Sequence, residues 1–120
     1  MYILNLFVLI FIINLIFKNK IKLIDSNEAK NKINQNYFNK IIDVRTNKEY
    51  KLGNHPESIN LPIEPNNNLT EENLKHINKN KPILIYCRSG RRALNAAKIL
   101  KNKFNFKKLY YINSDYKTII

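Results

Sequence analysis

The sequence has one cysteine, two glycines and no tryptophan among its 120 residues. A single cysteine cannot form an intrachain disulfide, so nothing indicates an oxidised, disulfide-stapled secreted domain. Cys87 and the two histidines, His55 and His76, do not have the spacing of metal ligands. No phosphate-loop or dinucleotide-binding motif occurs either, and we therefore expect neither a metal nor a cofactor.

Acidic residues are also few. The chain carries 9 acidic residues against 21 basic ones, which gives a net charge of +12. Such an excess is compatible with a nucleic acid or an anionic membrane as partner. The lysines, however, are spread along the chain with no dense run and no interleaved aromatic residues, which favours an ordinary solvated surface. We therefore expect no nucleic-acid partner.

What the chain does have is a long hydrophobic run at its N-terminus. Residues 1–17 read MYILNLFVLIFIINLIF and contain no charge. As a helix this run would be about 25 Å long, a little short of a hydrocarbon core of roughly 30 Å, and the lysines that follow can extend it by snorkelling. We predict a single-pass transmembrane anchor with a basic flank over residues 1–21 and a separate domain over residues 22–120.

Two alternatives to an anchor are a cleaved signal peptide and a buried core helix. A signal peptide needs positive charge before the run and a small-residue cleavage site, but no charge precedes the run and the first alanine is Ala29. A core helix is disfavoured because the run is apolar on all faces. With an anchor, Lys18, Lys20 and Lys22 follow the span, so the positive-inside rule places the domain in the cytoplasm, at the cell (inner) membrane.

Segments typical of strands and helices alternate along the rest of the chain. The apolar, β-branched segments predict strands at 23–24, 40–44, 59–61, 82–87 and 108–112. The helical segments are 27–36 after a cap at Ser26, 46–52 before Gly53, 70–77, and 93–100. This alternation predicts a small α/β domain with a mainly parallel sheet.

The arginines are concentrated where the cysteine lies. The chain has only four, and three of them fall in YCRSGRR, residues 86–92. Cys87 ends the predicted strand 82–87, and in open α/β sheets ligands bind at the carboxyl ends of strands. Gly90 lets loop amides point inward, and the start of the next helix adds partial positive charge.

These features together indicate a reactive cysteine. Arg88, Arg91 and Arg92 can grip an oxyanion bidentately, and positive charge of this kind favours the thiolate form of a cysteine. We therefore predict that Cys87 is a nucleophile at the base of an anion-binding cradle. The alternative is a buried structural cysteine followed by solvent-facing arginines.

Two motifs resemble those of rhodanese domains. The first is IIDVRTNKEYKLGNHPESINLP at residues 41–62, and the second is ILIYCRSGRR at residues 83–92. The resemblance covers residues 22–113 and implies a small, parallel-sheet, rhodanese-like domain. A hydrophobic anchor before a single domain is similar to small membrane-associated bacterial rhodaneses.

The resemblance implies a sulfurtransferase. Cys87 would take a sulfane sulfur from a thiosulfate-like anion as a persulfide and pass it to a thiophilic acceptor such as cyanide or a thiol. The residues that would bind the donor's oxyanion are Arg88, Ser89, Gly90, Arg91 and Arg92. Asp43 and Arg45 would support the loop by charge pairing, although a solvated strand-end pair is equally compatible with the sequence. A membrane-protein partner is compatible with the anchor.

The chain also departs from the rhodanese pattern. The family's glycine-histidine turn here reads Gly53-Asn54-His55, so we expect His55 in a turn or at the surface, without a catalytic role. His76 is expected at the surface. The family's late glycine pair and tryptophan are missing from residues 112–116, and the closing helix should be shortened or lost.

Two other functions remain open. Cysteine phosphatases and arsenate reductases place five residues between cysteine and arginine, whereas here Ala93 stands at that position and Arg92 follows after four. The shorter loop favours a sulfur donor over a phosphate. The second alternative is a membrane-tethered rhodanese-like module for binding or regulation, with little or no activity.

The same resemblance suggests that Glu49 and Tyr50 serve helix packing.

Overall fold

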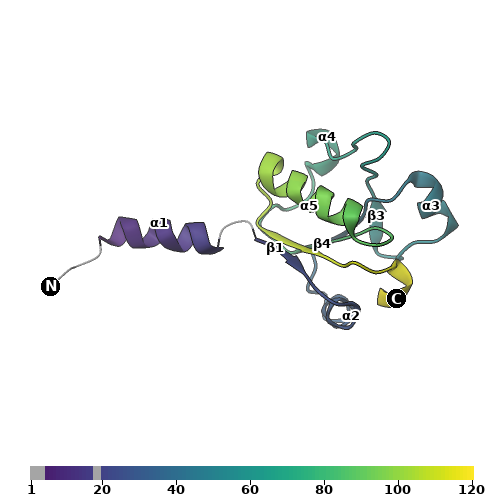
Figure 1. The fold of residues 1–120 in the computed structure, drawn as a ribbon, viewed down its shortest axis with the longest axis horizontal. Coiled ribbons are helices and arrows are strands. Elements are labelled where there is room, and N and C mark those ends of the chain that lie inside the picture. Colours follow the sequence, from purple (N-terminus) through teal and green to yellow (C-terminus); the bar gives the residue numbers. More distant parts are fainter. Residues whose placement is uncertain (1–4, 18–19) are drawn as a thin grey trace.

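A computed structural model describes residues 5–17 and 20–120 of the chain. In this part, one five-stranded sheet has the order β1-β5-β4-β2-β3, and every neighbouring pair is parallel (Figure 1). The strands are β1 (Lys20–Leu23), β2 (Lys40–Asp43), β3 (Ser58–Asn60), β4 (Ile83–Tyr86) and β5 (Lys108–Tyr111). The predicted small parallel-sheet α/β domain is confirmed.

Helices connect the strands and cover both faces of the sheet. They are α1 (Leu6–Phe17), α2 (Ser26–Asn34), α3 (Asn47–Leu52), α4 (Glu71–Leu74), α5 (Arg91–Phe104) and a 3₁₀ helix, η1 (Tyr116–Ile119). Asp25, rather than the predicted Ser26, caps α2, because its carboxylate accepts the Glu28 N–H at 2.8 Å. Helix α4 is shorter than predicted, and α5 starts two residues earlier than expected, directly after Gly90.

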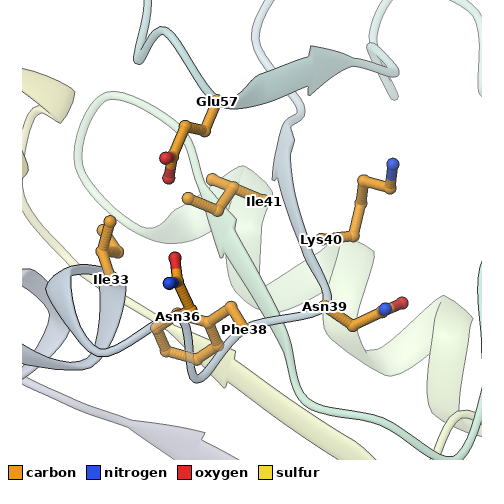
Figure 2. Close-up of a pocket in the computed structure, with 7 residues that line it drawn as sticks. All are labelled: Ile33, Asn36, Phe38, Asn39, Lys40, Ile41 and Glu57. Atoms are coloured by element: carbon orange, nitrogen blue, oxygen red, sulfur yellow. The ribbon is translucent and has the colours of Figure 1, made fainter.

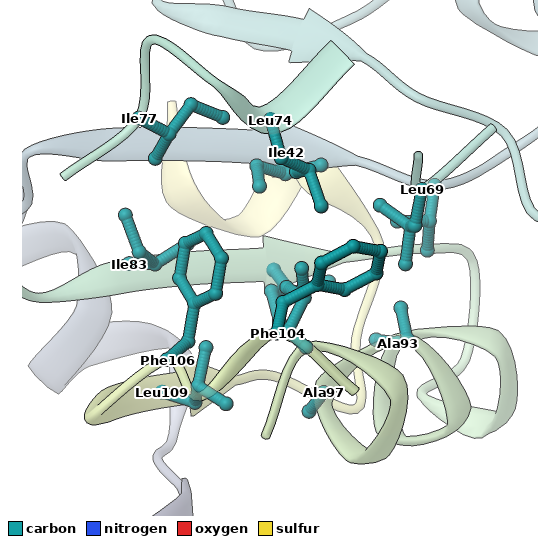
Figure 3. Close-up of a cluster of buried hydrophobic side chains, with 14 of the residues drawn as sticks. Ile42, Leu69, Leu74, Ile77, Ile83, Ala93, Ala97, Phe104, Phe106 and Leu109 are labelled. Atoms are coloured by element: carbon teal, nitrogen blue, oxygen red, sulfur yellow. The ribbon is translucent and has the colours of Figure 1, made fainter. Parts of the chain in front are cut away.

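Two hydrophobic clusters fix these layers. Successive side chains of β4 point to opposite faces: Ile83 and Ile85 pack toward α4 and α5, while Leu84 and Tyr86 pack toward α2 and η1. Figure 3 shows the first cluster, in which Ile83 and its neighbours in the sheet face Ala97 of α5. Because β4 is buried on both faces, the residues at its carboxyl end are held in a fixed position.

The N-terminal helix is described over part of the predicted anchor. Helix α1 has 12 residues, which corresponds to about 18 Å, and residues 1–4 and 18–19 of the predicted anchor lie outside the described residues. Within the described ranges, no helix has both the length and the apolar character needed to cross a membrane. The predicted transmembrane helix over residues 1–17 is therefore not supported. The side chains of residues 6–13 are apolar and 38–81% exposed.

The C-terminal segment forms a short helix after β5. Helix η1 is a single 3₁₀ turn capped by Asp115, whose carboxylate accepts the Lys117 N–H at 2.9 Å. It packs against α2, and Ile119 is buried in the cluster on that face. This short turn closes the sheet face that Tyr86 and Ile112 share.

Candidate active site

Cys87 lies where β4 ends and the loop to α5 begins. Its side chain is buried, with 1% of its surface exposed. Two backbone amides donate to its Sγ atom: the N–H of Gly90 at 3.0 Å and the N–H of Ala93 at 3.4 Å. Amides that converge in this way at a helix N-terminus stabilise negative charge on the atom that they surround. The geometry therefore suits a thiolate or a persulfide anion.

Gly90 makes this loop geometry possible. Its φ is +108°, in a region that other residues rarely adopt. A Cβ atom at this position would lie 2.9 Å from the Cα of Asn113, so the loop packs directly on the chain after β5. Any side chain here would move the loop away from Asn113 and with it the amide that contacts Cys87.

Two of the three loop arginines are paired with carboxylates. Arg92 donates to both carboxylate oxygens of Glu49, at 2.7 and 3.1 Å. Arg91 donates to both oxygens of Glu64, at 2.8 and 3.2 Å, and both of these side chains are largely exposed. Arg91 and Arg92 therefore lie at the start of α5, directly after the loop, and each is engaged with an acidic side chain.

Arg88 is the loop arginine that remains available for an anion. Its side chain is exposed, as is that of Ser89. Within residues 5–17 and 20–120, the Arg88 guanidinium forms neither a hydrogen bond nor an ion pair. Of the residues predicted to bind the donor's oxyanion, Arg88 thus offers a full charge, and Gly90 offers a backbone amide.

Glu49 links two elements, a role that its predicted packing position did not suggest. Its carboxylate accepts the N–H and the hydroxyl of Thr46, which completes a capping box at the start of α3, and it also holds Arg92. The hydrogen bonds from Arg92, aided by those from Thr46, lower the pKa of Glu49 to about 2. The threonine-x-x-glutamate spacing at 46–49 is the sequence signal for the cap, but it does not reveal the partner on α5.

Asp43 and Arg45 form a buried ion pair. The Arg45 Nε and Nη2 atoms donate to the Asp43 carboxylate at 2.6–3.1 Å, and Asp43 is fully buried. Arg45 also donates to the carbonyl of Gly53 at 2.7 Å and lies 4.7 Å from the ring centre of Tyr116. The two residues are paired as expected, and they are not a solvated strand-end pair. Their contacts reach the turn after α3 and the η1 segment.

The histidines lie away from the cysteine. His55 is in a turn, as predicted, but it is buried: its N–H donates to the Tyr86 hydroxyl at 3.0 Å, and its Nδ1 accepts the Glu57 N–H at 3.1 Å. Burial lowers the pKa of His55 below its usual value. His76 is exposed, as expected.

An open depression of about 250 Å³ lies beside the loop. Its lining residues are Arg45, Glu49, Leu52, Gly53, Arg88, Asp115, Tyr116 and Lys117. The depression has room for a small anion near Arg88, and its walls come from α3, the active-site loop and η1. These three segments are far apart in the sequence and meet only in the folded domain.

Comparison with known families decides what kind of domain this is. Residues 22–119 match the model of the rhodanese-like domain. The chain belongs to the rhodanese-like domain family. Its rhodanese-like domain is 34% identical over 93 residues to the putative sulfur carrier protein YrkF of Bacillus subtilis, a match that covers 78% of this chain and 41% of the relative. It is 32% identical over 81 residues to the adenylyltransferase and sulfurtransferase UBA4 of Saccharomyces cerevisiae, which covers 62% of this chain and 18% of the relative.

The chain therefore spans less than half the length of these curated relatives. Among solved structures, it resembles a rhodanese-like domain protein from Staphylococcus aureus with 28% identity and a TM-score of 0.60, covering 79% of this chain and 85% of that one. The fold is also that of the single-domain sulfurtransferase RDL2 of Saccharomyces cerevisiae, with 19% identity and a TM-score of 0.61, covering 83% and 89% of the two chains. Sulfur transfer or sulfur carriage is thus named for both of the curated relatives.

Proposed function

We propose that this rhodanese-like domain is a sulfurtransferase in which Cys87 carries sulfane sulfur as a persulfide. The observation that supports this most directly is the pair of amide contacts on the Cys87 Sγ atom, at 3.0 and 3.4 Å. A buried structural cysteine would have no need of two donors aimed at its sulfur. The same donors stabilise an anionic sulfur.

The proposed reaction has two displacement steps. The Cys87 thiolate attacks the outer sulfur of thiosulfate, a new sulfur–sulfur bond forms, and sulfite leaves with the electron pair of the bond that breaks. An acceptor thiolate or cyanide then attacks the outer sulfur of the persulfide. This step yields the acceptor persulfide or thiocyanate and restores the Cys87 thiolate, so no oxidant or cofactor is consumed.

Arg88 has the role of binding the sulfonate end of the donor. Its guanidinium is exposed beside the depression, whereas Arg91 and Arg92 are each bound to a glutamate. We expect Arg88→Ala to lower the second-order rate of sulfur uptake roughly tenfold, because one charge-assisted contact to an anion is lost. The Lys98→Ala variant, on the exposed side of α5, is the matched control for loss of a charge.

Intact-mass measurement of the full chain tests the proposal. The protein, purified in a mild detergent, is incubated with thiosulfate and weighed with and without a reductant. We expect a gain of one sulfur atom that the reductant removes and that Cys87→Ser abolishes; Cys87 is the only cysteine in the chain, so the site is unambiguous. A folded sample that gains no sulfur contradicts the use of thiosulfate.

The second candidate is a binding or regulatory module with little activity. The observation that favours it is the engagement of Arg91 and Arg92, which leaves one loop arginine for a substrate. Such a module would bind a partner equally well before and after Cys87→Ser. The sulfurtransferase proposal instead requires that this variant be inactive.

The membrane location is a separate proposal. The uncharged run of residues 1–17 and the exposed apolar side chains on α1 support attachment to the cell membrane, with the domain in the cytoplasm. Extraction of isolated membranes at alkaline pH should leave the chain in the pellet, and protease added to inside-out vesicles should digest the domain. Release of the chain by alkaline extraction would contradict an integral anchor, and digestion only in right-side-out vesicles would contradict the orientation.

A further inference from the structure

Lysines gather at the edge of the sheet where the strands begin, opposite the edge that holds Cys87. Strand β1 begins at Lys20, β2 at Lys40 and β5 at Lys108, and Lys81 lies two residues before β4. Since all five strands are parallel, their first residues meet at one edge. We call this surface the lysine edge. Its members are Lys20, Lys22, Lys40, Lys79, Lys81, Lys107 and Lys108.

Strand register and loop contacts show that these lysines are neighbours. Lys20 is directly opposite Lys108 in the β1–β5 pair. The N–H of Lys107 donates to the carbonyl of Lys79 at 2.9 Å, which brings the turn before β4 against the start of β5. Lys40 is opposite Ile83, the first residue of β4. The lysine edge is thus a continuous surface across four strands, although its members come from four segments of the chain that are 18 to 39 residues apart.

Few carboxylates neutralise this surface. The acidic residues that form ion pairs with arginine, Asp43, Glu49 and Glu64, are all on the Cys87 side of the domain. Across the described residues, Lys22, Lys40 and the other members after Lys20 form no ion pair. Glu57 lies near the start of β3, but Figure 2 shows the Lys40 side chain extending away from its carboxylate.

The lysine edge also has a cleft with aromatic walls. A depression of about 210 Å³ is lined by Lys20, Lys22, Tyr37, Lys107, Lys108, Leu109 and Tyr110. The hydroxyls of Tyr37 and Tyr110 are 2.7 Å apart, and the Lys32 ammonium lies 4.3 Å from the centre of the Tyr37 ring. Lysines can bind phosphate groups, while tyrosines favour the region where lipid headgroups meet hydrocarbon.

We propose that the lysine edge binds the surface of a bilayer that contains anionic phospholipids. Charge complementarity supports an anionic partner. Chain continuity favours a lipid surface over a nucleic acid, because β1 begins three residues after α1 ends, and α1 exposes apolar side chains such as Phe7 and Phe11. An apolar segment next to a basic patch is the combination that gives stable membrane attachment. This orientation leaves Cys87, at the opposite edge, facing away from the lipid.

Vesicle flotation with the full chain tests this proposal. The edge variant replaces Lys20, Lys22, Lys107 and Lys108 with glutamine. The control variant replaces four exposed lysines elsewhere, Lys30, Lys48, Lys51 and Lys98, and so removes the same charge. Binding is measured to phosphatidylcholine vesicles with and without phosphatidylserine, and the increment due to phosphatidylserine isolates the electrostatic contribution from that of α1.

We expect phosphatidylserine to increase binding of the wild type and the control variant, and salt to reduce that increase. In the edge variant, the increase in binding caused by phosphatidylserine should be at least about tenfold smaller. The reason is that each lysine near an anionic surface raises the binding affinity roughly fivefold. Equal losses in the two variants would show that only net charge matters and would overturn the proposal. No increment in the wild type would overturn it as well.

Two further measurements keep the result interpretable. Circular dichroism and thiosulfate-dependent sulfur uptake at Cys87 report whether the edge variant is folded, and neither involves the substituted lysines. A generic double-stranded RNA is the second probe. If the edge variant binds vesicles like the wild type but no longer binds the RNA, the surface serves nucleic acid and the proposal is wrong.

Discussion

Strand β2 is four residues long, yet its two ends belong to different kinds of surface. It begins at Lys40, which is partly exposed on the lysine edge, and it ends at Asp43, which is fully buried against Arg45. At the end of the strand, each charge has a partner at hydrogen-bonding distance. At the beginning, Lys40 forms no ion pair with any described residue, and its side chain extends away from Glu57 (Figure 2).

This difference extends across the whole sheet. On the Cys87 side, arginines bind carboxylates through two hydrogen bonds each, and such pairs fix geometry. On the other side, lysines with long flexible stems provide positive potential without fixing any position. Arginine thus occurs where side chains hold the active-site loop in place, and lysine occurs where the surface has a positive electrostatic potential but no fixed contact. Substitutions at the two edges should therefore differ in their effect on stability.

The largest effect is expected at the buried end of β2. Asp43→Asn leaves the Arg45 guanidinium buried without its counter-ion, which should lower the free energy of unfolding by about 3 kcal/mol. Lys40→Gln, at the other end of the same strand, should change it by no more than about 0.5 kcal/mol. Urea denaturation of the two variants measures the contrast. Equal losses would show that the two edges do not differ in this way.

A smaller loss is expected for Gly90→Ala. The positive φ and the close approach to Asn113 should together cost about 2 kcal/mol of stability, and sulfur uptake at Cys87 should slow because the Gly90 amide moves. Lys98→Ala is the control, since Lys98 is exposed on α5 and lies outside the loop. Normal uptake in Gly90→Ala would show that the amide contact is not required.

The next effect concerns the ion pair between α3 and α5. Glu49→Gln keeps an oxygen for the Thr46 cap but removes the charge that binds Arg92, and we expect a loss of about 1 kcal/mol near neutral pH. The pKa of Glu49 is lowered from 4.5 to about 2 in the folded protein. A lowered pKa means that the stabilisation is present above pH 4.5 and is lost as the pH falls toward 2.

Urea denaturation at several pH values therefore provides the test for Glu49. The difference in the free energy of unfolding between wild type and Glu49→Gln should be constant from neutral pH to about pH 5. Below that pH it should shrink, because the Glu49 carboxylate becomes protonated as the pH approaches its lowered pKa. A difference that grows on acidification would contradict the ion-pair explanation.

The smallest effect is expected for Arg91→Ala. The Arg91–Glu64 pair has the same bidentate geometry as Arg92–Glu49, but its side chains are 65% and 46% exposed. Solvent screening should make the loss of stability much smaller for Arg91→Ala than for Arg92→Ala. Thermal denaturation of Arg91→Ala and Arg92→Ala in parallel compares the two pairs, and a larger loss for Arg91→Ala would mean that burial does not decide their strength.

Much of this site could be predicted from the sequence because its parts are adjacent in the chain. YCRSGRR contains the strand end, the cysteine, the glycine and the helix start, and the structure places them in that order around the Sγ atom. Asp43 and Arg45 are two residues apart, so their pairing was also predictable. What could not be predicted was that Arg91 and Arg92 would each pair with a glutamate. Glu49 and Arg92 are 43 residues apart and meet only when α3 packs beside α5.

The lysines show a second limit. Their dispersal along the chain predicts an ordinary solvated surface, because nothing in the linear order indicates that several of them meet at one edge of the sheet.

The sequence by itself determined the cysteine at the end of a strand, the glycine in the loop after it and the alternation of strands and helices, since each of these depends on residue type and on close neighbours. The tertiary structure decided which charges meet. In an all-parallel sheet, strand ends collect at one edge and strand beginnings at the other. That arrangement gathers Cys87 with paired arginines at one edge and dispersed lysines at the other, because strand order brings together residues that the chain keeps apart.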